Sequence, residues 1–467
     1  MDMFNRVAHA HLVTLRAIVG PRFVATDPDA LKAASCDETE DLCFLPEVVV
    51  RPRTAQEVAE ILKLATEAGF PVTPRGGGTG LSGGALPVFG GIVLAMDRFD
   101  KIIEIDRENL FAVVESGVIT ETFQDAVEAQ GLFYPPDPAS RGTCFIGGNI
   151  AENSGGPRAV KYGVTKDWVY GLEVVLPTGE IIRPGGKLLK NVSGYNLTQL
   201  FIGSEGTLGV ITRAVLRLIA KPRFASLLLA AFEDPHEACK AVPALFHAGL
   251  VPSACEFMER DAMQMAVGHL DKPMPNSDAP AQLLIELDGN DEDRLEEEIE
   301  LAGKVCDESG AMDVLLAETG ARRTEIWEVR RAVGEAVKAH SLYKEEDTVV
   351  PRAQLPDLFV GVKEICGRHG VRSVCYGHAG DGNLHVNLLK DTLTDQEWSE
   401  RLPPTITEVF EYCVSLGGTI SGEHGIGWSQ KPYLHIAMPQ AELELMRSLK
   451  RVFDPAGILN PGKVFDM

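Results

Sequence analysis

The sequence contains no apolar run long enough to cross a membrane. A spanning helix needs about 18 consecutive apolar residues, and the longest candidate, Phe224 to Phe232, is much shorter. The N-terminal segment also lacks the continuous apolar core and small-residue cleavage site of a signal peptide. We therefore expect a cytoplasmic chain without a transmembrane segment, which could meet a membrane surface through an electron-acceptor partner.

Cysteine is sparse and unpatterned. The nine cysteines are scattered, odd in number, and include no Cys-x-x-Cys pair. Iron–sulfur clusters and structural zinc sites use closely spaced cysteines, and disulfide frameworks are typical of short secreted chains. We expect nine reduced, mostly buried thiols, so electrons from any redox reaction would leave through another molecule.

Positive charge is also scarce. The chain has 44 Lys and Arg against 67 Asp and Glu, for a formal net charge of −23. A nucleic acid or an anionic membrane is therefore disfavoured as the main partner. The 467 residues are 45% hydrophobic and 24% charged, as in a globular chain of about two or three domains.

Glycine is the residue in excess, with 46 among 467 residues against an average near ~7%. It shows no collagen-like period and gathers in short windows, at 75–91, 142–163, 185–209, 377–382 and 417–427. Around these windows, strand-like and helix-like segments alternate from Leu45 onward, and Lys221-Pro222-Arg223 is the best boundary. The pattern predicts an α+β fold with an N-terminal helical segment (1–41), a first domain (42–221) and a second domain (222–467).

The first cluster, PRGGGTGLSGGALP (74–87), contains a literal G-x-G-x-x-G from Gly78 to Gly83. A dinucleotide Rossmann site needs a helix after this motif, but Pro87 and another strand-like run follow instead. The alternatives are a glycine-rich turn and a loop whose bare backbone amides surround a phosphate. Two similar clusters, 143–163 and 190–209, flank a hairpin predicted around Pro177 to Gly179. Three clusters in one domain favour a backbone that encloses a long ligand.

Four motifs, PRGGGTGLSGGA, PPDPAS, GGNIAENSGG and GSEGTLGVIT, resemble the FAD-binding domain of the vanillyl-alcohol-oxidase superfamily. The likeness points to the FAD-linked oxidase branch of D-lactate dehydrogenases, glycolate oxidase flavoprotein subunits and D-2-hydroxyglutarate dehydrogenases. It implies a PCMH-type FAD-binding domain, an α+β substrate or cap domain and a helical C-terminal segment. The first loop has no histidine, so the resemblance implies non-covalent FAD. The implied FAD-binding residues are Pro74, Arg75, Gly76, Gly77, Gly78, Thr79, Gly80, Leu81, Ser82, Gly83, Pro136, Asp137, Ser140, Thr143, Gly147, Gly148, Asn149, Ala151, Ser154, Glu205, Gly206, Ile211 and Asn460.

A second constellation carries histidines and carboxylates. CYGHAGDGNLHVNLL (375–389) holds His378 and His385, and SGEHGIG (421–427) holds Glu423 and His424. His385 and Asn387 are two apart on a predicted strand, so both should face the same side. Two histidines and a carboxylate suit a divalent metal with open positions, while surface histidines beside an ordinary turn are the alternative.

The resemblance assigns roles to these positions. It implies a metal held by His378, His385 and Glu423, a substrate contact at Asn387, and His424 as the catalytic base and a substrate-binding residue. The metal, which zinc, manganese or iron would satisfy, would polarise the α-hydroxyl while the Cα hydride goes to flavin N5.

Arg330 matches the family arginine that binds the substrate carboxylate, whereas Arg331 reads as a solvated helix residue. The hydroxyglutarate enzymes carry a threonine four residues after this arginine, where this chain has Gly334. They also carry a lysine before the next strand, for which Lys344 is a possible match of uncertain register. The acidic residues 345–347 that follow would repel a second substrate carboxylate, so D-lactate or glycolate is favoured.

The C-terminal motif DPAGILNPGKVF (454–465) is another family signature, and Asn460 and Lys463 could return to the flavin domain or simply end a packed tail. The leading hypothesis is a flavoprotein that oxidises a D-2-hydroxy acid to the 2-oxo acid. The alternatives are a D-2-hydroxyglutarate dehydrogenase, an oxygen-using oxidase of another alcohol, and a non-catalytic flavoprotein subunit. The expected acceptor is a quinone, an electron-transferring flavoprotein or an iron–sulfur subunit, and a homodimer is possible.

Overall fold

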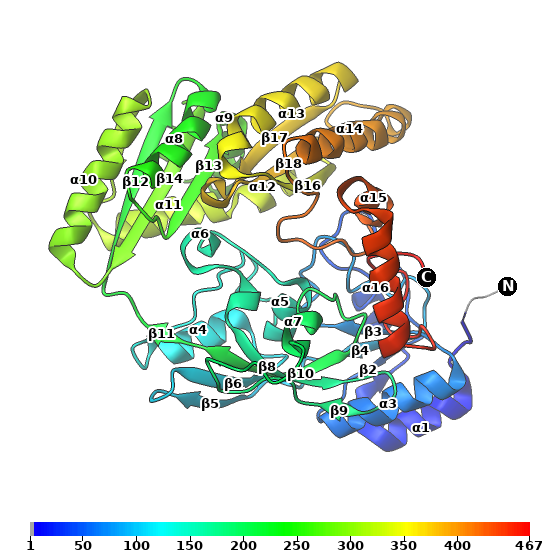
Figure 1. Cartoon of the computed structure of the whole chain (residues 1–467). Coiled ribbons are helices and arrows are strands. Elements are labelled where there is room, and N and C mark those ends of the chain that lie inside the picture. The colour runs from blue at the N-terminus through cyan, green and yellow to red at the C-terminus, as the bar shows by residue number, and fades with distance from the viewer. Residues whose placement is uncertain (1–3) are drawn as a thin grey trace. The chain divides into compact units, whose positions relative to one another are not determined.

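The computed structural model describes residues 4–467, so the first three residues of the predicted N-terminal segment lie outside the described part (Figure 1). The chain forms two units. Unit 1 holds the residues up to Ser154, residues 164–221 and residues 423–467, and unit 2 holds residues 155–163 and 222–422. The units therefore divide the chain differently from the predicted ranges, because the last 45 positions after Gly422 join unit 1.

Unit 1 begins with a four-stranded sheet in the order β1 (Val24–Ala25), β2 (Val48–Val50), β4 (Ile92–Ala95) and β3 (Val72–Arg75). Strands β2, β4 and β3 are parallel, and α3 (Ala55–Ala68) connects β2 to β3. Thr54 caps α3 by accepting a hydrogen bond from the Glu57 amide. The apolar face of α3 and α1 (His9–Val19) pack into the same core, and α2 (Pro28–Ala33) follows β1. This sheet fixes the position of Arg75, where the first glycine cluster starts.

The second sheet of unit 1 is antiparallel, in the order β5 (Ile102–Asp106), β6 (Phe111–Glu115), β10 (Val210–Arg217), β8 (Val169–Val175) and β9 (Ile181–Ile182). The β8–β9 pair is the hairpin predicted around Pro177 to Gly179. Helices α4 (Thr120–Glu128), α5 (Ile146–Glu152) and α7 (Leu197–Phe201) lie in the connections, and β7 (Leu132–Phe133) pairs with β11 (Ile219–Ala220). The second and third glycine clusters adjoin α5 and α7.

The C-terminal segment of unit 1, red in Figure 1, contains α15 (Leu434–Ala437) and α16 (Gln440–Phe453). After α16 the chain returns to the first sheet, where Leu459 forms a parallel bridge with Val72 of β3. Ile458 and Leu459 are buried in the core that surrounds α3. Residues beyond 453 therefore complete unit 1 rather than extending unit 2.

Unit 2 is built on one seven-stranded antiparallel sheet. Its order is β15 (Ala311–Leu316), β12 (Phe224–Phe232), β14 (Ala281–Gly289), β13 (Ala254–Glu259), β17 (Arg372–Gly377), β18 (Asn383–Leu389) and β16 (Tyr343–Val349). The short helix α6 (Ala159–Tyr162) also belongs to this unit, and Tyr162 donates a 2.8 Å hydrogen bond to Asp288.

Helices cover both faces of this sheet. One face packs α9 (Arg260–Leu270), α11 (Gly320–Arg331) and α12 (Val333–His340) against Met258 and Tyr376. On the other side lie α8 (Pro235–His247), α10 (Glu292–Glu308) and α13 (Leu355–His369), with α14 (Asp395–Ser415) beside α13. Helices α11 and α12 meet at Ala332.

One expectation about cysteine is wrong. Cys36 and Cys43 form a disulfide, because the chain between them folds back and brings their Cα atoms to 4.6 Å. The other seven cysteines are free and buried, as expected. None of the helices in residues 4–467 is long and apolar enough to cross a membrane.

Candidate active site

The three glycine clusters meet within unit 1. A Cβ atom at Gly77 would lie 2.5 Å from the carbonyl oxygen of Thr143, and one at Gly76 would touch the backbone of Gly148. A Cβ at Gly206, in the third cluster, would lie 3.5 Å from Pro74. The backbones of the predicted FAD-binding segments thus form one continuous wall, which only glycine permits at position 77.

Two side chains of the C-terminal segment, Asn460 and Lys463, form hydrogen bonds with this wall. The Asn460 amide donates hydrogen bonds to the carbonyl oxygens of Gly84 (3.0 Å) and Glu205 (2.7 Å). Lys463 Nζ donates to the carbonyl oxygen of Leu86 (2.6 Å) and to Asn460 Oδ1 (3.2 Å). Both side chains are buried, so the predicted return of this segment to the flavin domain agrees with the structure.

Arg75 offers an unused donor beside the first cluster. Its Nη2 donates to the carbonyl oxygen of Cys36 at 2.7 Å. Its Nη1 and the Ser82 hydroxyl are buried and have no hydrogen-bond partner among residues 4–467. Burial lowers the pKa of Arg75, while Asp37 nearby opposes the shift. A guanidinium donor, a hydroxyl and bare backbone amides fit a phosphate-bearing cofactor such as FAD.

Two buried carboxyl groups lie behind the same loops. Glu205 accepts hydrogen bonds from the amides of Ile426 (2.8 Å) and Gly427 (2.7 Å). Burial raises the pKa of Glu205, although the hydrogen bonds from these two amides act in the opposite direction. Burial and the neighbouring Glu205 raise the pKa of Glu152 well above its usual value. Burial also lowers the pKa of Lys463 to about 7. Sequence reasoning did not single out Glu152, because nothing local distinguishes it from a surface glutamate.

In unit 2, one face of the sheet is polar at the β13–β17–β18–β16 end. His385 lies opposite Tyr376 on one side and Asp347 on the other, and Asn387 lies opposite Glu345. His385 and Asn387 are two residues apart on β18 and share this face, as the sequence predicts. Residues far apart in the chain thus form one patch of side chains.

His378 follows β17 and turns toward this patch. Its Nδ1 lies 2.9 Å from both carboxylate oxygens of Glu256. The rings of His378 and His385 lie 5.2 Å apart, nearly perpendicular to each other. Both histidines are more than 90% buried, so neither is the ordinary surface histidine of the alternative interpretation.

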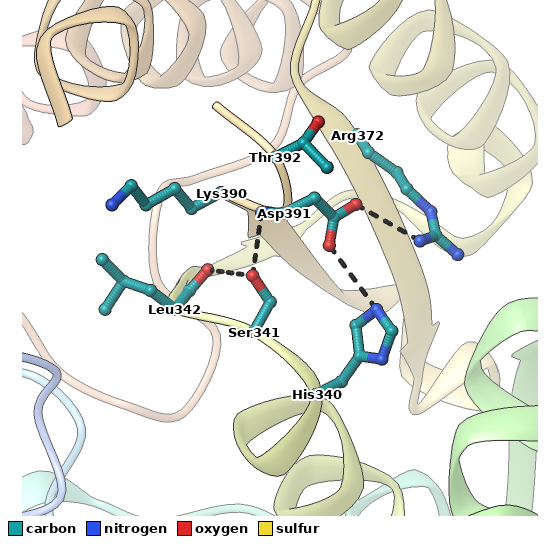
Figure 2. A pocket seen from close by; sticks show the side chains of 7 residues that line it. All are labelled: His340, Ser341, Leu342, Arg372, Lys390, Asp391 and Thr392. Carbon is teal, nitrogen blue, oxygen red and sulfur yellow. Dashed lines mark hydrogen bonds and ion pairs between the residues drawn. The ribbon is translucent and has the colours of Figure 1, made fainter. Parts of the chain in front are cut away.

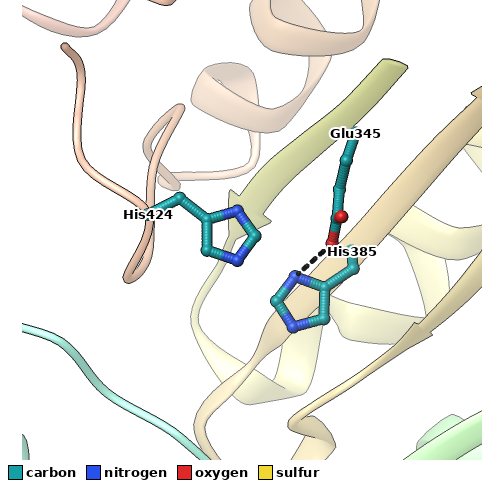
Figure 3. Close-up of side chains that lie close together, drawn as sticks. All are labelled: Glu345, His385 and His424. Carbon is teal, nitrogen blue, oxygen red and sulfur yellow. Dashed lines mark ion pairs between the residues drawn. The ribbon is translucent and has the colours of Figure 1, made fainter. Parts of the chain in front are cut away.

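Acidic groups surround His385. Its Nδ1 lies 3.5 Å from Glu345, as Figure 3 shows, and 3.6 Å from Asp347. Because side chains alternate along β16, Glu346 and Lys344 point to the opposite face. Of the three acidic residues 345–347, only Glu345 and Asp347 therefore lie on the face that carries His385. Lys344 does not share that face.

Asp347 also binds the last two residues of unit 2. Its carboxylate accepts hydrogen bonds from the Gly422 amide (2.8 Å) and the Ser421 hydroxyl (3.1 Å). Glu423 and His424 belong to unit 1, but they follow Gly422 directly in the chain, and Figure 3 draws His424. Since consecutive Cα atoms are about 3.8 Å apart, this anchor fixes where Glu423 starts.

Arg330 lies in the last turn of α11 and is 7% exposed. Its Nη2 forms a 2.5 Å ion pair with Glu256, and its guanidinium lies 5.1 Å from the Tyr376 ring centre. Its Nε is buried without a hydrogen-bond partner in the described part of the chain. Arg331 instead stacks on Trp327 at 5.2 Å. The inner position of Arg330 agrees with the distinction drawn from the sequence.

Glu256 is the residue that sequence reasoning missed. It is fully buried, and burial raises its pKa, but the charges of His378 and Arg330 outweigh burial and leave the pKa below its usual value. The available signal was a lone carboxylate within the apolar run Ala254 to Met258, since a buried charge needs specific partners.

Figure 2 shows a separate pocket in unit 2, lined by residues 340–342, 372 and 390–392. Its charged groups pair with neighbouring residues. Asp391 lies 3.3 Å from Arg372 and 3.5 Å from His340, and Lys390 pairs with Asp395. We assign this pocket no ligand.

Two family models together cover most of the chain. The model described as an FAD binding domain matches residues 46–185, and the model described as the C-terminal domain of FAD linked oxidases matches residues 221–464. The second match spans more than half of the chain.

Three named relatives are similar over nearly their full length. The glycolate oxidase subunit GlcD of Bacillus subtilis (strain 168) is 42% identical over 92% of this chain and 91% of its own. The D-lactate dehydrogenase of Anaerostipes hadrus is 40% identical over 90% and 89%. The D-2-hydroxyglutarate dehydrogenase of Stutzerimonas stutzeri (strain A1501) is 34% identical over 97% and 98%.

Solved structures share the fold. p-Cresol methylhydroxylase with bound substrate aligns with a TM-score of 0.80 at 18% identity, covering 97% of this chain and 96% of that one. The 4-ethylphenol oxidase from Gulosibacter chungangensis aligns at 0.79 and 21%, covering 99% and 98%. The predicted vanillyl-alcohol-oxidase (PCMH-type) fold is confirmed.

Proposed function

The chain belongs to the FAD-linked oxidase family, and we propose that it oxidises a D-2-hydroxy acid, with D-lactate or glycolate favoured, to the 2-oxo acid. It is an oxidoreductase of the branch whose relatives are named glycolate oxidase, D-lactate dehydrogenase and D-2-hydroxyglutarate dehydrogenase. The observation that carries the proposal is the buried Nε of Arg330, which has no hydrogen-bond partner among residues 4–467 and belongs to a helix on the sheet face that bears two buried histidines. This arrangement suits a small anion that also presents a hydroxyl group.

Arg330 binds the substrate carboxylate through its free N–H edge. A guanidinium fork matches a carboxylate, and burial strengthens the interaction because water does not compete. Asn387 contributes a second polar contact, since its Oδ1 is buried without a hydrogen-bond partner in residues 4–467. Glu345 and Asp347 line the same face and repel a second carboxylate, which favours monocarboxylates over D-2-hydroxyglutarate.

His378, His385 and Glu423 would hold a divalent metal. The rings of His378 and His385 are nearly perpendicular and adjacent, and Glu423 follows directly after Gly422, whose amide is bound by Asp347. Two imidazoles and a carboxylate suit zinc, manganese or iron. When bound, the metal acts as a Lewis acid that lowers the pKa of the substrate hydroxyl.

His424 accepts the hydroxyl proton on an imidazole nitrogen. Its neighbour Glu423 is the metal-side residue, and adjacent side chains in a glycine-flanked loop can point in different directions. Chain segments 74–83, 136–154 and 205–211 together with Asn460 would hold FAD without a covalent bond. FAD supplies the acceptor for the hydride that leaves Cα.

Electrons taken up by bound FAD would leave through an external acceptor. The seven free cysteines are dispersed and buried, which supports a quinone, an electron-transferring flavoprotein or a separate iron–sulfur subunit. A homodimer is compatible with this arrangement.

The test is anaerobic flavin bleaching across D- and L-lactate, glycolate and D-2-hydroxyglutarate, before and after chelation and with zinc, manganese or iron restored. We expect D-lactate or glycolate to bleach the flavin fastest, chelation to slow bleaching, and one metal to restore it. Fastest bleaching by D-2-hydroxyglutarate would support the alternative substrate. Peroxide formed in air at the rate of substrate oxidation would indicate an oxidase. A yellow protein that none of these acids bleaches would contradict the proposal.

A further inference from the structure

We propose that Glu256 is a positioning residue that orients His378 and Arg330 together and so sets the spacing between the hydroxyl side and the carboxylate side of the substrate site. The assignment of those two sides rests on the proposed function. The positioning itself rests on contacts within unit 2.

Glu256 joins two groups that lie far from it in the chain. Its two oxygens are each 2.9 Å from His378 Nδ1, and Oε2 is 2.5 Å from Arg330 Nη2. The side chain is 0% exposed. It leaves β13 on the face that carries Met258, which lies opposite Tyr376 of β17. One rigid strand therefore sets the position of a histidine and an arginine.

The contact determines the state of the His378 ring. A carboxylate only accepts hydrogen bonds, so His378 Nδ1 must carry the hydrogen. The lone pair of the neutral imidazole is then on Nε2, the nitrogen available to a metal. Carboxylate partners of this kind orient metal-binding histidines and increase their basicity.

The same carboxylate aims Arg330. It occupies Nη2, and the buried Nε remains without a hydrogen-bond partner in residues 4–467. The guanidinium therefore presents its other N–H groups in a fixed direction. A ligand whose hydroxyl and carboxylate are on adjacent carbons fits this fixed spacing, and a 3-hydroxy acid, with one more carbon between them, does not.

Stability alone does not account for a carboxylate at this position. The residues of β13 on either side of Glu256, namely Ala254, Cys255, Phe257 and Met258, are apolar and buried. An apolar residue of similar size would avoid the desolvation cost of a buried ion network. What Glu256 adds is orientation, because an apolar side chain at this position would accept no hydrogen bond from His378 or Arg330.

The test uses Glu256→Gln, Glu256→Asp and the control Glu259→Gln. Glu259 is a second buried carboxylate on β13, on the opposite face, paired with Lys363 at 2.7 Å. A glutamine amide at position 256 can donate to His378 Nδ1, which moves the ring hydrogen to Nε2. Aspartate keeps the charge but is one methylene shorter.

The first measurement is the ¹⁵N spectrum of histidine-labelled, metal-free holoprotein at mildly alkaline pH, with His378→Gln to assign the signal. We expect wild type and Glu259→Gln to carry the His378 hydrogen on Nδ1, and Glu256→Gln to carry it on Nε2. A wild-type hydrogen on Nε2 would overturn the proposal. This readout needs neither metal nor turnover, so it stands apart from any failure of the proposed function.

The second measurement is Zn²⁺ and Mn²⁺ affinity with flavin content as the folding check. Loss of such an orienting partner typically weakens metal binding by about 10–100-fold, which we expect for Glu256→Gln, with partial recovery in Glu256→Asp. In steady-state turnover, Glu256→Gln should also raise KM for the 2-hydroxy acid. The ratio of kcat/KM for the 2-hydroxy acid to kcat/KM for the matching 3-hydroxy acid should fall. Wild-type-like affinity and selectivity in a flavin-loaded Glu256→Gln protein would contradict the assignment.

Discussion

The Asn460 amide donates a 2.7 Å hydrogen bond to the carbonyl oxygen of Glu205, although the two residues are 255 positions apart. Both residues have positive φ angles, 43° for Asn460 and 51° for Glu205. Each therefore holds a backbone conformation that side chains other than glycine and asparagine seldom adopt. The bond joins the third glycine cluster to the C-terminal segment, so the proposed flavin wall depends on residues near the C-terminal end of the sequence.

Replacing Gly77 by alanine should disrupt this wall. The new Cβ would lie 2.5 Å from the Thr143 carbonyl oxygen, and backbone cannot yield as a flexible side chain can. We expect Gly77→Ala to lower the thermal midpoint by several degrees and to purify largely free of flavin. Flavin absorbance per protein and a melting curve check both effects.

Gly80→Ala is the matched control in the same loop. A Cβ at Gly80 has no heavy atom within 4 Å in the described structure, and Gly80 does not have a positive φ angle. We expect the flavin-free Gly80→Ala protein to have the same thermal midpoint as flavin-free wild type. If this variant nevertheless binds less flavin, that loss would show that the ligand lies close to residue 80. Equal melting points for Gly77→Ala and wild type would contradict the packing argument.

Arg330→Lys should impair substrate binding more than flavin binding. Lysine keeps the charge but loses the planar fork and the Nε donor. We expect KM for the preferred acid to rise about 10-fold or more, the cost of roughly one strong hydrogen bond to a charged group. Steady-state kinetics provide the check.

Arg331→Lys is the companion control because Arg331 stacks on Trp327 rather than pairing with Glu256. Its KM should stay within about twofold of wild type. If Arg331→Lys raised KM more than Arg330→Lys did, our assignment of the substrate carboxylate to Arg330 would be wrong.

His424→Ala should slow the chemical step while leaving the flavin bound. A positioned general base contributes about 10²–10⁴-fold to a proton transfer, so flavin reduction should slow by that range. Stopped-flow absorbance under anaerobic conditions gives the rate. His435→Ala, on α15 with its Nδ1 2.9 Å from the Pro432 carbonyl, should reduce at the wild-type rate. Unchanged reduction in His424→Ala would exclude His424 as the base.

Glu152→Gln should change the pH dependence of stability. Burial raises the pKa of Glu152 above its ordinary value of 4.5. Between 4.5 and the raised value, the native state holds a proton that the unfolded chain releases, so stability falls as pH rises. Glutamine mimics the protonated carboxyl and escapes this loss.

We expect the variant to match wild type near pH 4.5 and to be more stable at pH 8 by about 1 kcal/mol or more, since one pKa unit corresponds to about 1.4 kcal/mol. Thermal midpoints at several pH values test this, with the exposed Glu60→Gln as the control. Parallel curves for Glu152→Gln and wild type would contradict it.

Local patterns predicted much of unit 1. The β8–β9 hairpin and the glycine loops each depend on contiguous residues, and the structure contains them. The Cys36–Cys43 disulfide was missed because a spacing of seven residues indicates a bridge only once the intervening chain is known to fold back.

Unit 2 shows the limit of local patterns. Glu256 and His378 are 122 residues apart, and they meet only because β13 pairs with β17. The sequence could not reveal that pairing. It did contain the alternation along β16, which separates Glu345 and Asp347 from Lys344 and Glu346, but the acidic residues were read as one block.

The division of the chain has a consequence for synthesis. Unit 1 is completed by residues 423–467, which follow all of unit 2. At about 5–20 residues per second, the ribosome needs on the order of ten seconds or longer to reach Glu423 from Lys221. The glycine loops therefore leave the ribosome well before Asn460 exists to fasten them. Unit 2 can fold during translation, but Asn460 can complete the wall of glycine loops only after unit 2 has been synthesised.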